Sequence, residues 1–293
     1  MIPASPQNYL YARLSPDGRR VALDNGAGED DDIWIWDFTG ETLTRLVLGD
    51  GTHSYPTWTP DGERIAYSDD SGDIYWKASN NTGAPEVLVD SPGSEGADPP
   101  TPYFFTPDGA ALVFRDIDHP HTDDDLAMIS LEKDGSAVWR LNGDFLERNA
   151  ELSPDGRWMA YESDESGRPE VYVRPFPEVE EDQVLISNDG GMFPLWSRDG
   201  RELFYVRPGA SNQLMSVSID TVEPGEAFVF RDREVVMEWP YSVRGQGRNY
   251  DISLDGQRFL ALKAEGTGTE QGGSVEINVV LNWFTELRER MGN

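Results

Sequence analysis

The sequence contains no cysteine, which removes several kinds of chemistry at once. Disulfide bonds, thiolate nucleophiles and cysteine-based metal sites are all excluded. A chain without cysteine fits either side of a bacterial membrane, so this absence does not assign a compartment.

Histidine is nearly absent too, because the chain has only His53, His119 and His121. It contains no Gly-x-Ser-x-Gly motif, and no histidine follows residue 121, so the nucleophile and later histidine of a serine hydrolase are missing. The Gly-rich loop and the His-Arg-Asp catalytic loop of protein kinases are also missing. We therefore expect neither type of catalysis from this chain, although other enzyme classes stay open.

No apolar run approaches the roughly 18 residues that a membrane-spanning helix needs. The segment Met1–Leu10 has two prolines and no basic stretch, unlike a signal peptide. We expect no membrane insertion by this chain. If the natural protein is exported or anchored, we expect the segment responsible to lie outside these 293 residues.

Basic residues are scarce relative to acidic ones. The 24 Lys and Arg residues face 54 Asp and Glu residues, which gives a formal net charge of −30. Such a surface repels nucleic acid and anionic membranes, so no nucleic-acid partner is expected. The acidity favours solubility, as in a salty habitat, or attraction of cations and basic partners, and the sequence leaves these alternatives open.

What the chain does have is an internal repeat. An apolar residue followed by Ser/Thr-Pro-Asp-Gly occurs four times, and two degenerate copies follow. The six copies are Leu14–Gly18, Trp58–Gly62, Phe105–Gly109, Leu152–Gly156, Trp196–Gly200 and Ile252–Gly256. Their aspartates are 44, 47, 47, 44 and 56 residues apart. A period of about 40–50 residues is typical of one propeller blade of four strands.

The residue types of the repeat explain its regularity. Proline presets φ at the first corner of a turn, aspartate accepts hydrogen bonds from nearby backbone amides, and glycine takes the position with positive φ. The repeat therefore predicts tight turns between paired strands. The six aspartates are expected to be structural and not catalytic.

Short β-branched and aromatic runs surround each turn. The runs directly after the turns are Val21–Leu23, Ile65–Tyr67, Leu112–Phe114, Met159–Tyr161, Leu203–Tyr205 and Phe259–Leu262. The third strands are predicted at Ile33–Trp36, Ile74–Trp76, Leu126–Ile129, Val171–Val173, Leu214–Val217 and Ile277–Leu281. More polar outer strands are predicted at Leu43–Val47, Glu86–Val89, Val138–Leu141, Gln183–Ile186 and Glu234–Met237.

These patterns predict an all-β fold: one six-bladed β-propeller domain spanning residues 1–293, with four-stranded antiparallel blades. The sixth blade shows no fourth strand after Leu281. The segment Asn282–Arg290 is predicted to be a short helix, and Met1–Ser5 is predicted to supply the missing strand and close the ring.

The repeated turn resembles that of the TolB-like six-bladed propellers, which are WD-repeat-like. Over the whole chain the sequence is also similar to the C-terminal propeller of bacterial transmembrane serine/threonine kinases and sensor-like proteins. The segments that carry this likeness are Asp32–Asp37, Tyr161–Pro177, Trp196–Tyr205 and Asn278–Leu287. The resemblance implies a domain of a larger bacterial protein on the extracytoplasmic or periplasmic side of the membrane.

The innermost strand of each blade ends at the repeated turn and should line a central channel. Alternation along these strands predicts that the channel is lined by Arg13, Thr57, Phe104, Glu151, Leu195 and Asp251. Glu151 and Asp251 are candidate ligands for Ca²⁺ or another cation. No cofactor is expected to be required. A second candidate metal site is the pair His119 and His121 with its neighbouring aspartates.

The face opposite the repeated turns carries loops that differ between blades. Its candidate ligand-binding residues are His53, Tyr55, Glu147, Arg148, Asn149, Trp239, Tyr241, Arg244 and Arg248. Exposed aromatics and arginines are typical of interaction hot spots, and the alternative is that several of them cap blade ends. We expect Arg148, Arg244 and Arg248 to form a basic site for a carboxylate or acidic peptide.

Together these features predict a non-catalytic binding, sensor-type or scaffold domain. Its expected partner is a protein, a peptide or a small ligand at the channel mouth, and the domain is expected to be monomeric. The alternative is a propeller hydrolase or lyase that uses a cation in the central channel. Three or more convergent side chains around a metal at the channel mouth would favour that alternative.

Overall fold

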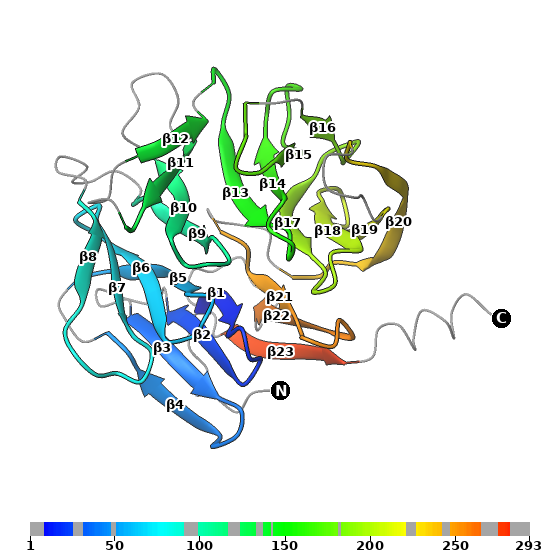
Figure 1. The fold of residues 1–293 in the computed structure, drawn as a ribbon. Helices are drawn as coiled ribbons and strands as arrows, with labels where there is room; N and C mark the ends of the chain where they lie inside the picture. The colour runs from blue at the N-terminus through cyan, green and yellow to red at the C-terminus, as the bar shows by residue number, and fades with distance from the viewer. Residues whose placement is uncertain are drawn as a thin grey trace.

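A computed structural model describes the protein over residues 9–25, 32–47, 51–90, 99–116, 124–132, 137–141, 143–180, 183–220, 227–241, 247–264 and 275–281. These residues form six antiparallel sheets arranged around a centre (Figure 1). None of them belongs to a helix that is long and apolar enough to cross a membrane.

Five sheets have four strands each, paired in chain order. They are β1 (Tyr9–Leu14), β2 (Arg20–Asn25), β3 (Asp32–Asp37) and β4 (Thr42–Arg45); β5 (His53–Trp58), β6 (Arg64–Asp69), β7 (Ile74–Ala78) and β8 (Glu86–Val89); β9 (Thr101–Phe105), β10 (Ala111–Asp116), β11 (Asp125–Ser130) and β12 (Ala137–Leu141); β13 (Glu147–Leu152), β14 (Trp158–Ser163), β15 (Glu170–Pro175) and β16 (Val184–Leu185); and β17 (Met192–Trp196), β18 (Glu202–Arg207), β19 (Gln213–Ile219) and β20 (Phe230–Glu238). The last sheet has three strands, β21 (Tyr250–Ile252), β22 (Arg258–Ala264) and β23 (Val275–Leu281).

The prediction of four-stranded antiparallel blades is confirmed for five sheets. Within the described residues the last sheet has three strands and ends at β23, so its predicted fourth strand stays a prediction. The predicted strand Met1–Ser5 and the predicted helix Asn282–Arg290 both lie outside the described residues.

The repeated turns have the predicted chemistry. In the first of them the Ser15 hydroxyl donates to Asp17 Oδ1 (2.6 Å), the Arg19 amide donates to the same oxygen (3.1 Å), and the Gly18 amide donates to the Ser15 carbonyl (2.8 Å). The hydroxyl-to-aspartate bond recurs in the other five turns. Hydrogen bonds from Ser15 and the Arg19 amide lower the pKa of the Asp17 carboxyl. The aspartates are therefore committed to their own turns.

Neighbouring turns also contact one another. A Cβ atom placed on Gly62 would lie 3.5 Å from Pro16 Cδ, so the second turn abuts the first. The same kind of contact closes the ring, since a Cβ on Gly18 would lie 3.0 Å from the Leu254 side chain of the last turn. Gly18 also has a φ of 68°, so both its conformation and its surroundings require glycine.

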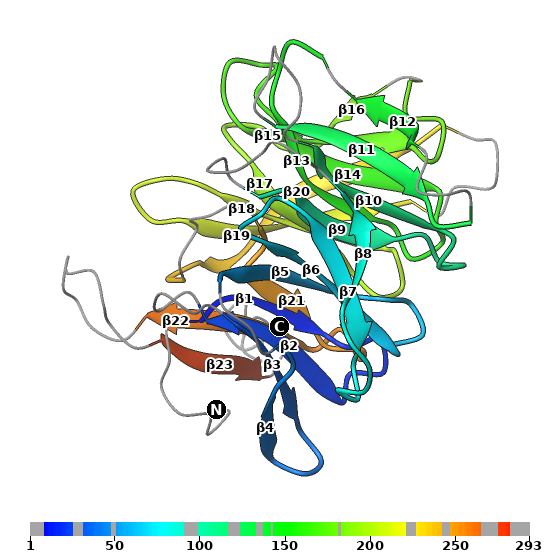
Figure 2. The ribbon, with the colours of Figure 1, turned by 90° about the vertical axis from the view of Figure 1, so that its left-hand side faces the viewer.

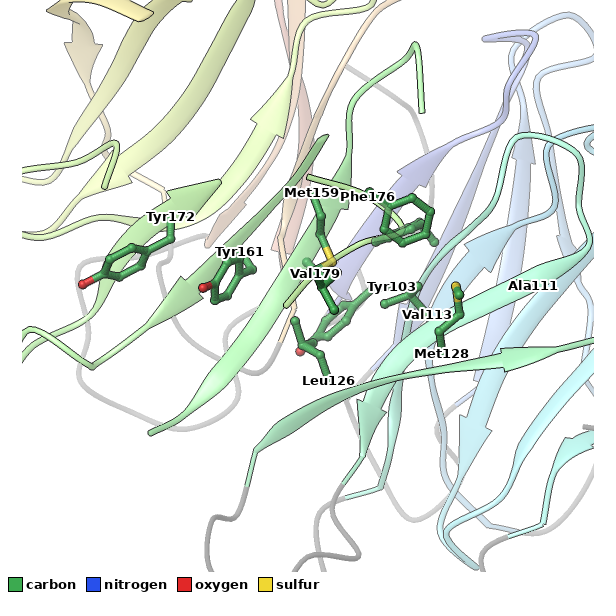
Figure 3. Close-up of a cluster of buried hydrophobic side chains, with 12 residues drawn as sticks. Tyr103, Ala111, Val113, Leu126, Met128, Met159, Tyr161, Tyr172, Phe176 and Val179 are labelled. Atoms are coloured by element: carbon green, nitrogen blue, oxygen red, sulfur yellow. The ribbon is translucent and has the colours of Figure 1, made fainter. Parts of the chain in front are cut away.

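The sheets are arranged face to face around the ring (Figures 1 and 2), and the clusters of buried apolar side chains lie between adjacent sheets. Figure 3 shows one such cluster, in which Tyr103 and Val113 of one sheet face Met159 and Tyr161 of the next. Another cluster places Leu260 of the last sheet against the first sheet. Each sheet therefore packs on both neighbours, which explains why the predicted strands are continuous apolar runs.

Most of the inner strands are interrupted by a β-bulge. The pairing register shifts within β1, β5, β9, β13 and β17. At three of these bulges a residue other than glycine has positive φ: 61° at Tyr55, 54° at Asn149 and 56° at Phe193. A bulge adds a residue to one strand and reverses the inward–outward alternation beyond it. Between the repeated turn and the bulge, each side chain points to the side that simple alternation predicts. Beyond the bulge, each side chain points to the opposite side.

Candidate functional site

The inner strands and the repeated turns enclose a cavity of about 320 Å³ at the turn-side end of the ring. Pro16, Pro60, Pro107 and Pro154, from the first four turns, contribute to its wall. Its aromatic wall is formed by Trp58, Tyr103, Phe104 and Phe105. This volume lies near the lower end of the range for small-ligand pockets.

Five of the six predicted channel residues line this cavity. They are Arg13, Thr57, Phe104, Glu151 and Asp251. The sixth, Leu195, is buried in the core cluster between the last two sheets. Alternation counted back from the turns therefore predicted the channel wall correctly at five of the six positions, which lie close to the turns.

Glu151 and Asp251 are joined to arginine and not to one another. The Nη1 atom of Arg248 lies 2.8 Å from Glu151 Oε2, and its Nη2 atom lies 4.0 Å from Asp251 Oδ1. Arg248 also donates through Nε to the Tyr250 carbonyl (2.9 Å) and through Nη1 to the Pro194 carbonyl (3.1 Å). Its guanidinium is thus a buried crosslink between the inner strands of three sheets.

Asp251 is held as a carboxylate by several donors. The amides of Leu14 and Ile252 donate to it at 2.9 and 2.8 Å, and Arg198 Nη2 lies 3.4 Å from Oδ1. Burial alone would raise the pKa of Asp251, but the charges of Arg198, Arg248 and Arg13 outweigh burial and lower it.

Arg13 differs from the other two channel arginines. Its Nη1 atom donates to the carbonyls of Ala12 and Arg248, and within the described residues it makes no direct ion pair, although the charges of Asp251 and Glu151 act on it from a longer distance. Burial, together with the like charge of Arg248, lowers the pKa of Arg13 to about 10. Three guanidinium groups and two carboxylates leave the cavity with a net charge of +1, inside a chain whose net charge is −30.

Arg198 occupies the proline position of the fifth repeated turn. The prolines at this position in the first four turns line the cavity, and the Arg198 side chain lines it as well. Sequence reasoning treated this turn as a degenerate copy and missed the arginine. The signal was available: a cation stands where the repeat otherwise places a channel-facing proline.

The residues predicted for the opposite rim do not form one exposed surface. Trp239 is only 2% exposed and packs on Tyr241 and Tyr250, with ring centroids 4.7 and 5.0 Å away. It belongs to the core cluster between the last two sheets. The expectation of an exposed contact at Trp239 is therefore wrong, and the alternative, a cap on blade ends, describes it.

Arg148 and Asn149 are committed to Glu162. Arg148 donates to Glu162 Oε1 through Nε (2.9 Å) and Nη2 (2.7 Å), while Asn149 donates to Oε2 (2.8 Å). The Nη1 atom of Arg148 also lies 3.6 Å from Asp124 Oδ2. Arg148 and Arg248 thus have different partners and line different cavities, so they do not share the predicted basic site.

Glu147 is buried at the start of β13. Its Oε2 atom has no hydrogen-bond partner within the described part of the chain. Burial, reinforced by the charge of Asp125, raises the pKa of Glu147 to about 8. Glu147 is thus a buried acid with a raised pKa, and not one of the exposed rim side chains that the sequence predicted.

The remaining rim candidates are half-buried aromatics. His53 packs edge-on against Tyr67 with ring centroids 5.6 Å apart, and Tyr55 packs on Tyr11 at 4.6 Å. Arg244, His119 and His121 lie outside the described residues. Over the described ranges, no three or more His, Asp or Glu side chains gather as metal ligands.

Comparisons with known proteins support the fold. No protein-family model and no curated protein match the sequence. Among solved structures, a protein described as TolB from Agrobacterium tumefaciens is similar with a TM-score of 0.65 and 18% identity, over 94% of this chain and 91% of that one. TolB from Acinetobacter baumannii has a TM-score of 0.65 and 21% identity, over 90% of this chain and 61% of that one.

An oligogalacturonate lyase in complex with manganese is also similar, with a TM-score of 0.59 and 14% identity over 95% of this chain and 75% of that one. At such identities the likeness concerns the fold and not the activity. The chain therefore has a TolB-like β-propeller fold.

Proposed function

We propose that the three-stranded sheet is the sixth blade of the propeller, and that the ring is a non-catalytic binding domain with its ligand site in the turn-side cavity. In this proposal the domain belongs to a larger bacterial protein and lies on the extracytoplasmic side of the membrane. The TolB-like fold supports this placement.

The composition of the cavity carries the proposal. Its wall combines aromatic side chains with arginines, the residue types enriched in binding hot spots. The two acids in the wall are engaged by Arg248 and Arg198, so neither is poised as a general base. A rigid ring with such a cavity is suited to holding a ligand in one orientation.

The second candidate is a lyase-type enzyme with a cation in the channel. The observation in its favour is the fold shared with a manganese-bound oligogalacturonate lyase. To coordinate the cation, Glu151 and Asp251 would have to break their ion pairs with Arg248 and Arg198. Calorimetric titration with Mn²⁺ and Ca²⁺ separates the two candidates: saturable heat that is lost in both Glu151→Gln and Asp251→Asn would favour the enzyme.

The binding function is testable by selecting displayed peptides with free C-termini against the immobilised domain. Pro60 and Leu254 occupy the same position in two repeated turns, but only Pro60 lines the cavity. Pro60→Trp should therefore weaken the selected peptides at least tenfold, while Leu254→Trp, the matched control, should leave their affinity unchanged. Failure to obtain any peptide that distinguishes the two variants would contradict the proposal.

A further inference from the structure

The turn-side cavity has a charge pattern that is specific enough to define a ligand class. This step rests on the binding function proposed above and concerns which ligand is bound. Arg13, Arg198 and Arg248 supply three positive charges, and Glu151 and Asp251 supply two negative ones. Arg13, Glu151 and Asp251 come from inner strands, Arg198 from a repeated turn and Arg248 from the segment just before β21, so only the assembled ring brings these five groups of four sheets together.

The hydrogen-bonding capacity of the three arginines is used unequally. Arg248 is buried and satisfied by two carbonyls and Glu151. Arg198 uses Nε and Nη2 for the Ile252 carbonyl and Asp251, which leaves Nη1 for a ligand. Arg13 uses only Nη1, so its Nε and Nη2 donors remain. The uncommitted donors thus belong to Arg13 and Arg198.

Desolvation makes these donors strong. Arg13 is half-buried in the channel and makes no direct ion pair with a carboxylate of the described residues, and a partly desolvated guanidinium binds an anion more tightly than an exposed one. A guanidinium edge with two adjacent donors matches the two oxygens of a carboxylate. The site therefore favours a planar anion over a cation.

The net charge of +1 also limits the anion. A monoanion neutralises the cavity, whereas a dianion such as phosphate would add excess negative charge next to Glu151 and Asp251. Trp58, whose indole N–H donates to the Arg13 carbonyl, and Phe104 line the same cavity and provide an apolar wall for a group attached to the carboxylate. A peptide C-terminus with an apolar last residue combines both features.

We infer that the turn-side cavity binds a monoanionic carboxylate attached to an apolar or aromatic group, as at the C-terminus of a peptide, through Arg13 and Arg198. Arg248 is the positioning residue: it fixes Glu151 and Asp251, and its carbonyl accepts from Arg13. The site lies on the side of the repeated turns, opposite the variable loops.

The test is isothermal titration of the domain with N-acetyl-Ala-Ala-Ala-Phe as the free acid and as its C-terminal amide. The acid should bind at least tenfold more tightly than the amide and should weaken as salt is raised. Arg198→Gln, whose side chain is partly exposed, and Arg13→Gln should each weaken the acid at least tenfold. Arg231→Gln removes the same charge from an exposed pair with Asp220 and should change nothing.

Inorganic phosphate should compete with the acid only weakly, and strong competition would overturn the monoanion assignment. Equal affinity for acid and amide, or unchanged affinity in Arg198→Gln, would overturn the inference while leaving a binding domain. If the acid does not bind, and peptides selected through Pro60 are indifferent to C-terminal amidation, the inference fails and the binding function stands. If no Pro60-dependent peptide exists, both the inference and the binding function fail.

Thermal melting of each variant identifies any loss of affinity that unfolding causes. If Arg13→Gln does not fold, the result for Arg198→Gln alone decides.

Discussion

The same inner strands line both ends of the central channel, but the two ends differ in whether their polar side chains already have partners. At the turn side, Arg13 and Arg198 retain donors beside a cavity. At the opposite side, Arg148 is fully engaged by Glu162 and Asp124, and Trp239 is part of the core. Among the described residues, the uniform turns therefore surround a cavity with uncommitted arginine donors, whereas Arg148 and Trp239 of the variable rim are engaged by neighbouring side chains.

The largest effect on this difference between the two ends is expected from replacing Arg248, the buried arginine of the channel. Arg248→Met leaves Glu151 and Asp251 without their shared partner in a buried site. We expect a loss of about 3–5 kcal/mol in the free energy of unfolding. Urea denaturation measures it, with exposed Arg231→Met as a control expected to change stability by less than about 0.5 kcal/mol. Equal effects of the two substitutions would show that Arg248 is not a crosslink.

The comparison also predicts that Trp239 acts on stability and not on recognition. Trp239→Ala should cost about 3 kcal/mol, because the side chain fills the seam between the last two sheets. Phe145→Ala, at a 40% exposed rim position, should cost far less. Denaturant unfolding reports the stabilities, and peptide binding by the folded fraction should be unaltered in both. If the Trp239→Ala variant is stable but binds peptide more weakly, the binding site lies at the rim and not at the turns.

The buried acid of the rim should give a measurable pH dependence. The pKa of Glu147 is raised to about 8, so between its ordinary value and pH 8 the folded state binds the proton that the unfolded state has lost. The stability that this protonated side chain contributes is fully present below the ordinary pKa of glutamate. It is lost as the pH rises from that value through about 8. Glu147→Gln should match the wild type near pH 4 and exceed it by about 2 kcal/mol at pH 8, after allowance for solvent screening. Parallel unfolding curves at all pH values would contradict the assignment.

The smallest effect is expected at the turns. Asp17→Ala removes the acceptor of the Ser15 hydroxyl and the Arg19 amide, which should cost about 1 kcal/mol. Asp255→Ala in the last turn should cost a similar amount, because it loses equivalent bonds. Thermal unfolding measures both. A loss of peptide binding without a change in melting would instead give the aspartates a functional role.

Much of the fold was accessible from local sequence. The turn positions, the second and third strands and the outer strands follow from Pro-Asp-Gly chemistry and β-propensity, which act within a few residues. The channel residues Arg13, Thr57, Phe104, Glu151 and Asp251 were also predicted, because strand alternation holds close to the repeated turns. The rim predictions rested on loop positions, and a place in a loop does not show whether a side chain such as Trp239 is buried.

By itself, then, the sequence determined the repeat, most of the strands and five of the side chains that line the channel, but not Arg198 or Arg248. Only the tertiary structure decided which charges meet there. Arg248 is about a hundred residues from Glu151, and Arg13 is 235 residues from Arg248, so their contacts depend on the ring packing its last sheet against its first. An ion pair depends on distance and desolvation in space, and neither quantity is encoded in spacing along the chain.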